Sequence, residues 1–95
     1  MTAEEAREQI AADPDVAILD VREPFEIEKG KIDGSRKVDQ ELGNEIVRGW
    51  PRERQIIVYC EHGDRSMKAT QFLKQQGFEN IRSLKGGYTA WSASQ

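Results

Sequence analysis

With 95 residues, the chain has room for one hydrophobic core of ordinary size, so a single domain is expected over residues 1–95. Its formal net charge of −3, with 33% of residues charged, argues against nucleic acid as a partner, because surfaces that bind nucleic acid are basic. The apolar runs are short and the N-terminus lacks the apolar core of a signal peptide, so no membrane partner and a cytoplasmic location are expected.

The chain contains one cysteine and one histidine, Cys60 and His62. One cysteine cannot form an internal disulfide, which agrees with a reducing cytoplasm. One cysteine and one histidine also fall short of a closed set of metal ligands, so no metal is expected. Cys60 is therefore either an inert buried side chain or a group with chemistry to perform.

A helix and a buried strand are predicted first. Residues 2–13 are predicted to be helical, because Thr2 can cap the helix and Glu5 stands at the capping-box position. The run 16–21 is apolar on both faces of an extended chain, which is typical of a parallel strand covered by helices on both sides.

The middle of the chain predicts three short elements. Pro24 suits the first position of a helix, and Gly30 stops that helix after one or two turns. Residues 35–38 are predicted to form a short strand in a third layer. A further helix is predicted over 39–49, with Asp39 as its cap.

The second half continues the alternation of strands and helices. The segment 55–60 is the strongest strand of the chain, and a helix is predicted over 66–77. A last strand over 80–84 and a short closing helix over 88–93 follow. The alternation predicts an α/β fold: a parallel sheet of four to five short strands with helices on both faces.

Cys60 stands at the carboxyl end of a strand, where ligands bind in open parallel sheets. The helix is expected about six residues later, and a loop this short must curl, with Gly63 supplying the backbone freedom. A curled loop turns its N–H groups inward and, with the helix N-terminus, forms a site for anions. Cys60 facing that site would be held as the nucleophilic thiolate, and Arg65 could orient an incoming oxyanion. A buried, inert cysteine is the alternative that spacing alone leaves open.

Three segments, in the expected order, resemble the single-domain rhodanese (thiosulfate sulfurtransferase) family: AILDVREPFEIEKGKIDGS, IIVYCEHGDRS and GFENIRSLKGGYTAW. The resemblance spans about residues 2–91 and implies a rhodanese-like fold. It implies that Cys60 takes the outer sulfur of a small anionic donor such as thiosulfate and carries it as a persulfide. A thiol, cyanide or a protein acceptor then removes the sulfur, with no cofactor. The protein is expected to be a monomer or a weak dimer.

The resemblance also implies which residues form the site. Cys60 is expected to be catalytic, with a substrate-binding loop formed by Glu61, His62, Gly63, Asp64, Arg65 and Ser66. Within this loop a solvated histidine, carboxylates at the rim and a serine that caps the next helix are expected. Asp20 and Arg22 are expected to support the loop by hydrogen bonds, with a surface salt bridge as the alternative.

Alternatives and departures from the family pattern remain. Phosphatases and arsenate reductases of the same architecture have a loop one residue longer, so this chemistry is not expected here. A persulfide carrier in a relay, or a binding module without activity, stays open. The usual GHIPGA of the family reads GKIDGS, with Lys31 and Asp33 at the changed positions. The first strand of the family is expected to be absent or very short.

Overall fold

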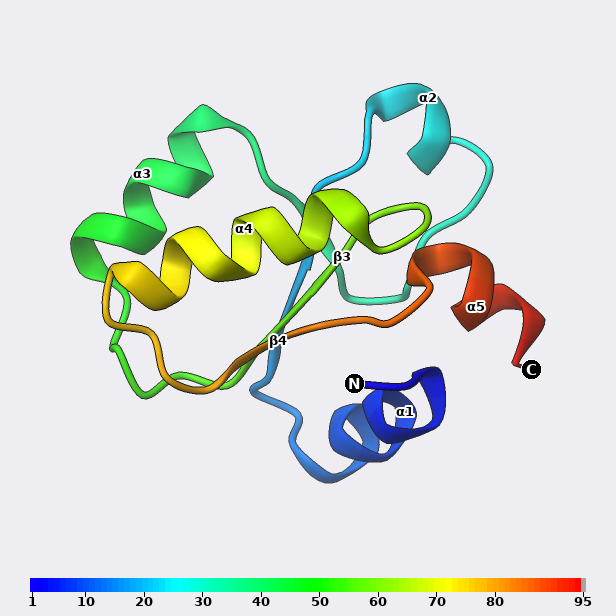
Figure 1. Cartoon of the computed structure of the whole chain (residues 1–95), viewed down its shortest axis with the longest axis horizontal. Helices are drawn as coiled ribbons and strands as arrows, with labels where there is room; N and C mark the ends of the chain where they lie inside the picture. Colours follow the sequence, from blue (N-terminus) through cyan, green and yellow to red (C-terminus); the bar gives the residue numbers. More distant parts are fainter. Residues whose placement is uncertain (95) are drawn as a thin grey trace.

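The computed structural model describes residues 1–94 and contains four strands and five helices (Figure 1). The strands are β1 (Ala17–Asp20), β2 (Arg36–Lys37), β3 (Ile56–Tyr59) and β4 (Ile81–Ser83). The helices are α1 (Ala3–Ala12), α2 (Pro24–Ile27), α3 (Gln40–Gly49), α4 (Asp64–Gln75) and α5 (Gly87–Ala93). All four strands are parallel, in the order β2-β1-β3-β4, which confirms the predicted α/β fold. The prediction that residues 35–38 form a strand in a third layer was wrong, because β2 is an edge strand of the same sheet.

Side chains at the helix starts cap α1 and α3 as the sequence predicted. The Glu5 amide donates to Thr2 Oγ1 at 3.1 Å, and the Thr2 amide donates to Glu5 Oε1 at 2.8 Å, which is a complete capping box. The Asp39 carboxylate accepts from the amide of Leu42 at 2.8 Å. These contacts fix where two of the covering helices begin.

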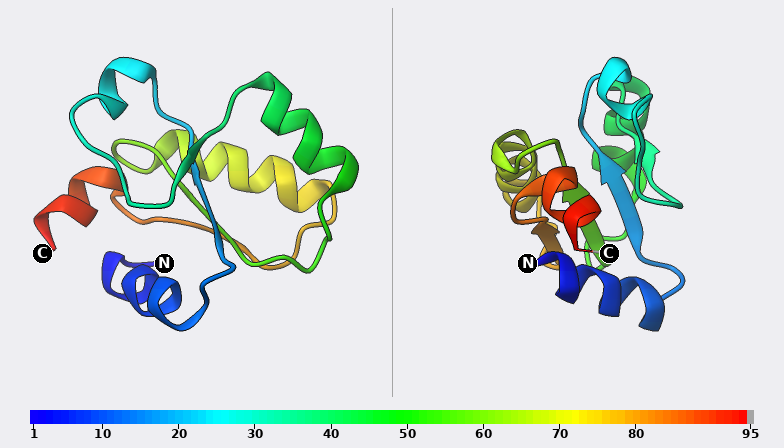
Figure 2. Two further views of the ribbon diagram at one scale, coloured as in Figure 1. Left: turned by 180° about the vertical axis from the view of Figure 1, so that it is seen from behind. Right: turned by 90° about the vertical axis from the view of Figure 1, so that its right-hand side faces the viewer.

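Helices cover both faces of the sheet (Figure 2). On one face α3 and α4 pack against the strands, around a core that includes Leu19, Ile46, Trp50, Val58 and Leu73. On the other face α1 and α5 enclose Ala6, Ile18, Ile57, Leu84 and Trp91. Because β1 and β3 contribute to both cores, all their residues are buried. Among the described residues, no helix is long and apolar enough to cross a membrane.

The chain enters α1 without a strand before it in the described residues, as expected. Met1 instead runs beside the end of β4, where its nitrogen donates to the Ser83 carbonyl at 2.9 Å. Its carbonyl oxygen accepts from the Lys85 amide at 2.7 Å. Two backbone hydrogen bonds therefore hold Met1 against the end of β4.

The two central strands, β1 and β3, are parallel, so their carboxyl ends lie side by side at the same end of the sheet. Their register pairs Asp20 with Tyr59, the last residue of each strand. The segments that follow, from Val21 and from Cys60, therefore leave the sheet as neighbours. This topology brings residues about 40 positions apart in the chain to one site.

Candidate active site

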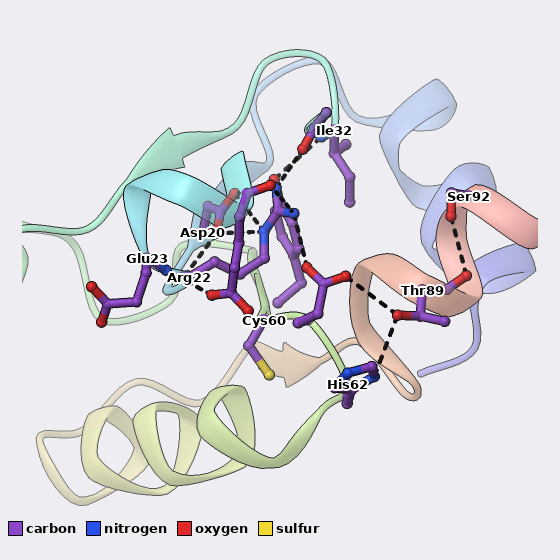
Figure 3. A network of polar contacts seen from close by, with 12 residues as sticks. Asp20, Arg22, Glu23, Ile32, Cys60, His62, Thr89 and Ser92 are labelled. Atoms are coloured by element: carbon purple, nitrogen blue, oxygen red, sulfur yellow. Dashed lines mark hydrogen bonds and ion pairs between the residues drawn. The ribbon is translucent and has the colours of Figure 1, made fainter. Parts of the chain in front are cut away.

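The sulfur of Cys60 lies inside the loop that joins β3 to α4 (Figure 3). The Gly63 amide donates to Sγ at 3.0 Å, and the Ser66 amide donates to it at 3.3 Å. Both amides belong to the start of α4, whose N-terminus adds partial positive charge. Amide N–H groups that point at a sulfur favour its thiolate form. Cys60 itself is fully buried.

Ser66 is a second hydrogen-bonding group beside the sulfur. Its Oγ lies 3.5 Å from Sγ and donates to the Gly63 carbonyl at 3.2 Å. The same oxygen is 2.7 Å from Ser83 Oγ on β4. The prediction that Ser66 caps the helix was wrong, because Gly63, with a φ of +108°, is the cap residue and α4 begins at Asp64. Ser66 therefore lies within the first turn and faces the sulfur.

Asp64 places a negative charge near the sulfur. Its Oδ1 is 3.9 Å from Cys60 Sγ, and the residue is exposed. Hydrogen bonds from its own amide and from that of Arg65 lower the pKa of the Asp64 carboxyl. The carboxylate is therefore ionised at neutral pH. Its charge, close to the sulfur, opposes a thiolate.

Arg22 is buried behind the loop and joins three segments (Figure 3). Its Nη2 contacts Asp20 Oδ2 at 2.9 Å and its Nε contacts Asp20 Oδ1 at 3.1 Å. Nη1 donates to Glu61 Oε1 at 3.1 Å, which connects β1 to the residue after the cysteine. The centroids of the Tyr88 and Tyr59 rings lie 4.4 and 5.3 Å from the guanidinium carbon. A surface salt bridge, the alternative for this pair, is wrong because both partners are buried.

The surroundings keep Arg22 charged. Burial alone would lower the pKa of Arg22, but its hydrogen bonds with Asp20 and Glu61 outweigh burial and raise that pKa. Nη2 also donates to the Gly30 carbonyl at 2.8 Å, beyond α2. The Glu61 carboxylate thus faces Arg22, whereas the sequence predicted it to be a charge at the rim. Through these hydrogen bonds, Arg22 ties Glu61, the residue that follows the cysteine, to β1 and to the segment after α2.

Arg65 forms a second link between α2 and α4. Its two terminal nitrogens each contact one carboxylate oxygen of Glu26, both at 2.9 Å. Hydrogen bonds from Arg65, together with that from the Glu23 amide, lower the pKa of Glu26 to about 2. The Arg65 side chain is 38% exposed, so this pair lies near the surface of the loop. A role of Arg65 toward an oxyanion stays a prediction.

The start of α5 holds the other side of the loop. The amide of Tyr88 donates to the Cys60 carbonyl at 2.8 Å, and that of Thr89 donates to the Glu61 carbonyl at 3.1 Å. Gly87, just before them, has a φ of +61°, and a Cβ there would lie 2.4 Å from the Cys60 carbonyl oxygen. Only glycine lets the two segments approach this closely.

His62 lies on the outer side of the loop, with Nδ1 3.3 Å from Thr89 Oγ1 (Figure 3). It is exposed, which confirms the prediction of a solvated loop histidine. The described part of the chain contains no group of three or more His, Cys, Asp or Glu side chains placed to hold a metal ion. The loop itself places one sulfur atom among backbone amides.

Comparison with known proteins decides the family. The model of the rhodanese-like domain family matches residues 2–94. The chain belongs to this family. The resemblance predicted from the three sequence segments is confirmed.

Two curated relatives and one solved structure show how close the match is. A sulfurtransferase of Allochromatium vinosum is 32% identical over 90 residues, covering 95% of this chain and 84% of the relative. Thiosulfate sulfurtransferase GlpE of Pseudoalteromonas translucida is 38% identical over 84 residues, covering 84% of this chain and 76% of the relative. The crystal structure of a rhodanese-related protein from Thermoplasma volcanium matches with a TM-score of 0.78 and 34% identity, covering 99% of this chain and 90% of that one.

Within this rhodanese-like domain, the predicted residues fall into two groups. Gly63, Asp64 and Ser66 lie around the sulfur of Cys60. The Asp20–Arg22 pair meets Glu61 behind it. The side chains of Arg65 and His62 instead turn to Glu26 and Thr89. Sequence reasoning missed Glu26, Ser83 and Gly87 as parts of the site. The paired glycines of LKGGY signalled a tight turn, but no local pattern pointed to its contact with the cysteine.

Gly87→Ala should displace the loop of the rhodanese-like domain. The added methyl group would overlap the carbonyl oxygens of Cys60 and Glu61, at 2.4 and 2.5 Å from its expected position. We expect the free energy of unfolding to fall by about 1–3 kcal/mol, as in other overpacked sites. We also expect the alkylation rate of Cys60 by iodoacetamide to change. Urea unfolding and mass spectrometry measure the two effects.

Gly34→Ala is the matched control for this substitution. Gly34 also has a positive φ, +85°, but a Cβ there would meet no atom within 4 Å. It therefore reports backbone strain without the clash. Equal losses of stability in the two variants, with unchanged alkylation of Cys60, would contradict the close approach of α5 to the loop.

Proposed function

We propose that the protein is a sulfurtransferase that moves a sulfane sulfur from thiosulfate, or a related anionic donor, to a thiophilic acceptor through a persulfide on Cys60. The observation that carries this proposal is the pair of amides, from Gly63 and Ser66, that donate to Sγ at 3.0 and 3.3 Å. They favour the thiolate, which is the form of cysteine that attacks sulfur. The names of the sulfurtransferase relatives support the same reaction class.

The reaction proceeds in two displacements. The Cys60 thiolate attacks the outer sulfur of thiosulfate, the S–S bond of the donor breaks, and sulfite leaves with the electron pair. The thiolate of an acceptor then attacks the outer sulfur of the persulfide, and the Cys60 thiolate leaves. The first half-reaction forms the persulfide that the second one consumes. The second regenerates the Cys60 thiolate that the first one requires, as in other ping-pong mechanisms.

An anionic donor has a defined entry point in this proposal. Cys60 has no exposed surface, so a donor must displace a neighbouring group to reach the sulfur. The Asp64 carboxylate is exposed, lies 3.9 Å from Sγ and belongs to the first residue of α4. Thiosulfate oxygens are chemically suited to take the place of this carboxylate at the N-terminus of α4, which favours an anion.

Intact-protein mass spectrometry tests the proposal. Incubation with thiosulfate should add one sulfur atom to the protein, and cyanide should remove it with formation of thiocyanate. Protein alkylated at Cys60 beforehand should gain nothing. Mercaptopyruvate in place of thiosulfate tests the donor, and an aryl phosphate tests the rival phosphatase chemistry. If neither thiosulfate nor mercaptopyruvate changed the mass of the protein, this result would contradict the function proposed here.

Arg65→Ala and Glu26→Gln should lower kcat/KM for thiosulfate by a similar, modest factor. Both remove the same bidentate pair between α2 and α4. For a partly exposed pair worth about 1 kcal/mol, we expect a loss of roughly 3–10-fold. Arg65→Lys should recover little, because a single ammonium cannot replace the planar fork. A 10–100-fold loss confined to Arg65→Ala would instead show that Arg65 contacts the donor directly.

The same pair gives a pH-dependent contribution to stability. The pKa of Glu26 is lowered from an ordinary value of 4.5 to about 2 in the fold. A carboxyl with a lowered pKa stabilises the fold above its unfolded value, and this contribution is lost as the pH falls through the folded value. The difference in unfolding free energy between wild type and Glu26→Gln should therefore be constant from about pH 8 to 5 and shrink toward pH 2. A constant difference across that range would contradict the ion pair.

A further inference from the structure

A cavity lies on the face of the sheet that α1 and α5 cover, and Cys60 is not among the residues that line it. Its volume is about 400 Å³, which falls within the usual range for small-molecule sites. Three segments border it, namely the second half of α1, the loop that follows α2, and α5. Ile10, Ala11 and Ile32 give this α1–α5 cavity an apolar surface. The proposed sulfur transfer makes no use of it.

Two aromatic side chains of α5 complete the wall of the cavity. They are Tyr88 and Trp91, one turn apart on the helix. Trp91 is held in place from α1, because the guanidinium carbon of Arg7 lies 3.8 Å from the centroid of its ring. Aromatic rings attract one another in offset and edge-to-face arrangements, in addition to the apolar area that they bury. The wall therefore suits a ligand that contains an aromatic ring.

Contacts between the bordering segments fix the shape of the cavity. Arg7 Nη2 on α1 donates to the Trp91 carbonyl on α5 at 2.8 Å. The amide of Ile32 donates to a buried phenol of β3 at 3.2 Å. Gly30 approaches α5 so closely that a Cβ there would lie 2.4 Å from the phenol oxygen of Tyr88. None of these contacts requires a ligand, so the cavity is formed before one binds.

Two opposite charges stand at the rim, on either side of the buried Ile32. Lys31 and Asp33 both line the cavity and are exposed, whereas Ile32 is 2% exposed. Within residues 1–94 neither forms an ion pair, with the other or with a third residue. Arg7, the remaining charged residue of the lining, already contacts Trp91. The fold therefore does not use the two rim charges, and both are available to a ligand.

We propose that the α1–α5 cavity binds a free α-amino acid with an aromatic side chain. The carboxylate of the ligand contacts the Lys31 ammonium, its ammonium contacts the Asp33 carboxylate, and its ring lies against Tyr88. The Cα atoms of residues two positions apart lie at most about 7 Å from each other. An α-amino acid carries both charges on one carbon, so it can bridge such a pair with a hydrogen bond of about 3 Å at each end. A ligand with a single charge would leave one rim residue unpaired.

Three ligands that share a phenyl ring test this assignment. L-Phenylalanine carries both charges, 3-phenylpropionate lacks the ammonium, and 2-phenylethylamine lacks the carboxylate. Binding is followed by tryptophan fluorescence, to which none of the three contributes. Trp91 in the cavity wall reports binding, whereas Trp50, the other tryptophan, belongs to the core on the opposite face of the sheet. L-Phenylalanine should bind with saturation and more tightly than either analogue, and absence of saturable binding would overturn the proposal.

Two variants that each remove one charge should separate the three ligands. Lys31→Gln should weaken binding of L-phenylalanine and 3-phenylpropionate roughly 2–5-fold, the effect of one exposed charge pair, and leave 2-phenylethylamine unchanged. Asp33→Asn should weaken binding of L-phenylalanine and 2-phenylethylamine by a similar factor and leave 3-phenylpropionate unchanged.

Lys29→Gln is the matched control for these variants. Lys29 is exposed two residues before Lys31 but does not line the cavity, so its loss should change the affinity of no ligand. Equal losses of all three ligands in either rim variant, or the same pattern of losses in the control, would overturn the proposal. The measurement involves no sulfur transfer, so its outcome is independent of the function proposed for Cys60.

Discussion

Cys60→Ser should abolish sulfur uptake and thiocyanate formation while leaving the fold nearly unchanged. A serine hydroxyl stays protonated at neutral pH and cannot carry a sulfane sulfur as a persulfide. The Gly63 and Ser66 amides can still donate to the smaller oxygen, so the loop keeps its hydrogen bonds. We expect the free energy of unfolding to change by no more than about 1 kcal/mol. Mass after thiosulfate treatment and urea unfolding measure the two outcomes, and residual sulfur transfer would contradict the mechanism.

Cys60→Ala separates the chemical role of the sulfur from its structural role. Alanine removes the acceptor of both amides and leaves them unpaired in a buried place. Each buried donor without a partner costs about 1–3 kcal/mol. The alanine variant should therefore be inactive like the serine variant but clearly less stable. Equal stability of the two variants would show that the amides do not depend on the sulfur.

Asp20→Ala should cause the largest loss of stability among the substitutions considered. It leaves the buried guanidinium of Arg22 with only the partly exposed carboxylate of Glu61 as a charged partner. Removing one partner of a buried ion pair costs about 3–5 kcal/mol, which is a large part of the total stability of a small domain. Urea unfolding measures the loss, and a change below about 1 kcal/mol would contradict a buried pair.

Two further variants define the origin of that loss. Asp33→Ala removes an exposed carboxylate without a hydrogen-bonding partner in the described structure, and it should leave stability unchanged. The double variant Asp20→Ala/Arg22→Met should be more stable than the sum of its single variants predicts, because neither charge is then left alone. Simple additivity would show that the two side chains act independently.

Much of the fold could be predicted because the signals are local. The Thr2 and Glu5 capping box, the doubly apolar run 16–21 and the strand before Cys60 each follow from residues within a few positions of one another. The curled loop was predicted for the same reason. A glycine three residues after Cys60 permits the turn that aims amides at the sulfur.

The remaining features of the site depend on pairing between distant segments. Glu26 and Arg65 are 39 residues apart, and Ser66 and Ser83 are 17 apart, so only the order of the strands brings them together. The start of α4 was misplaced for a different reason. Serine is a common helix cap, yet glycine with a positive φ occupies that position and draws Ser66 into the first turn.

The hydrogen bonds from α5 to the loop bear on how the protein is made. The carbonyls of Cys60 and Glu61 accept from the amides of Tyr88 and Thr89, which are synthesised almost thirty residues later. A ribosome-bound chain that has not yet exposed this last helix lacks the support on that side of the loop. We therefore expect the loop to take its final form around the sulfur only after α5 has left the ribosome.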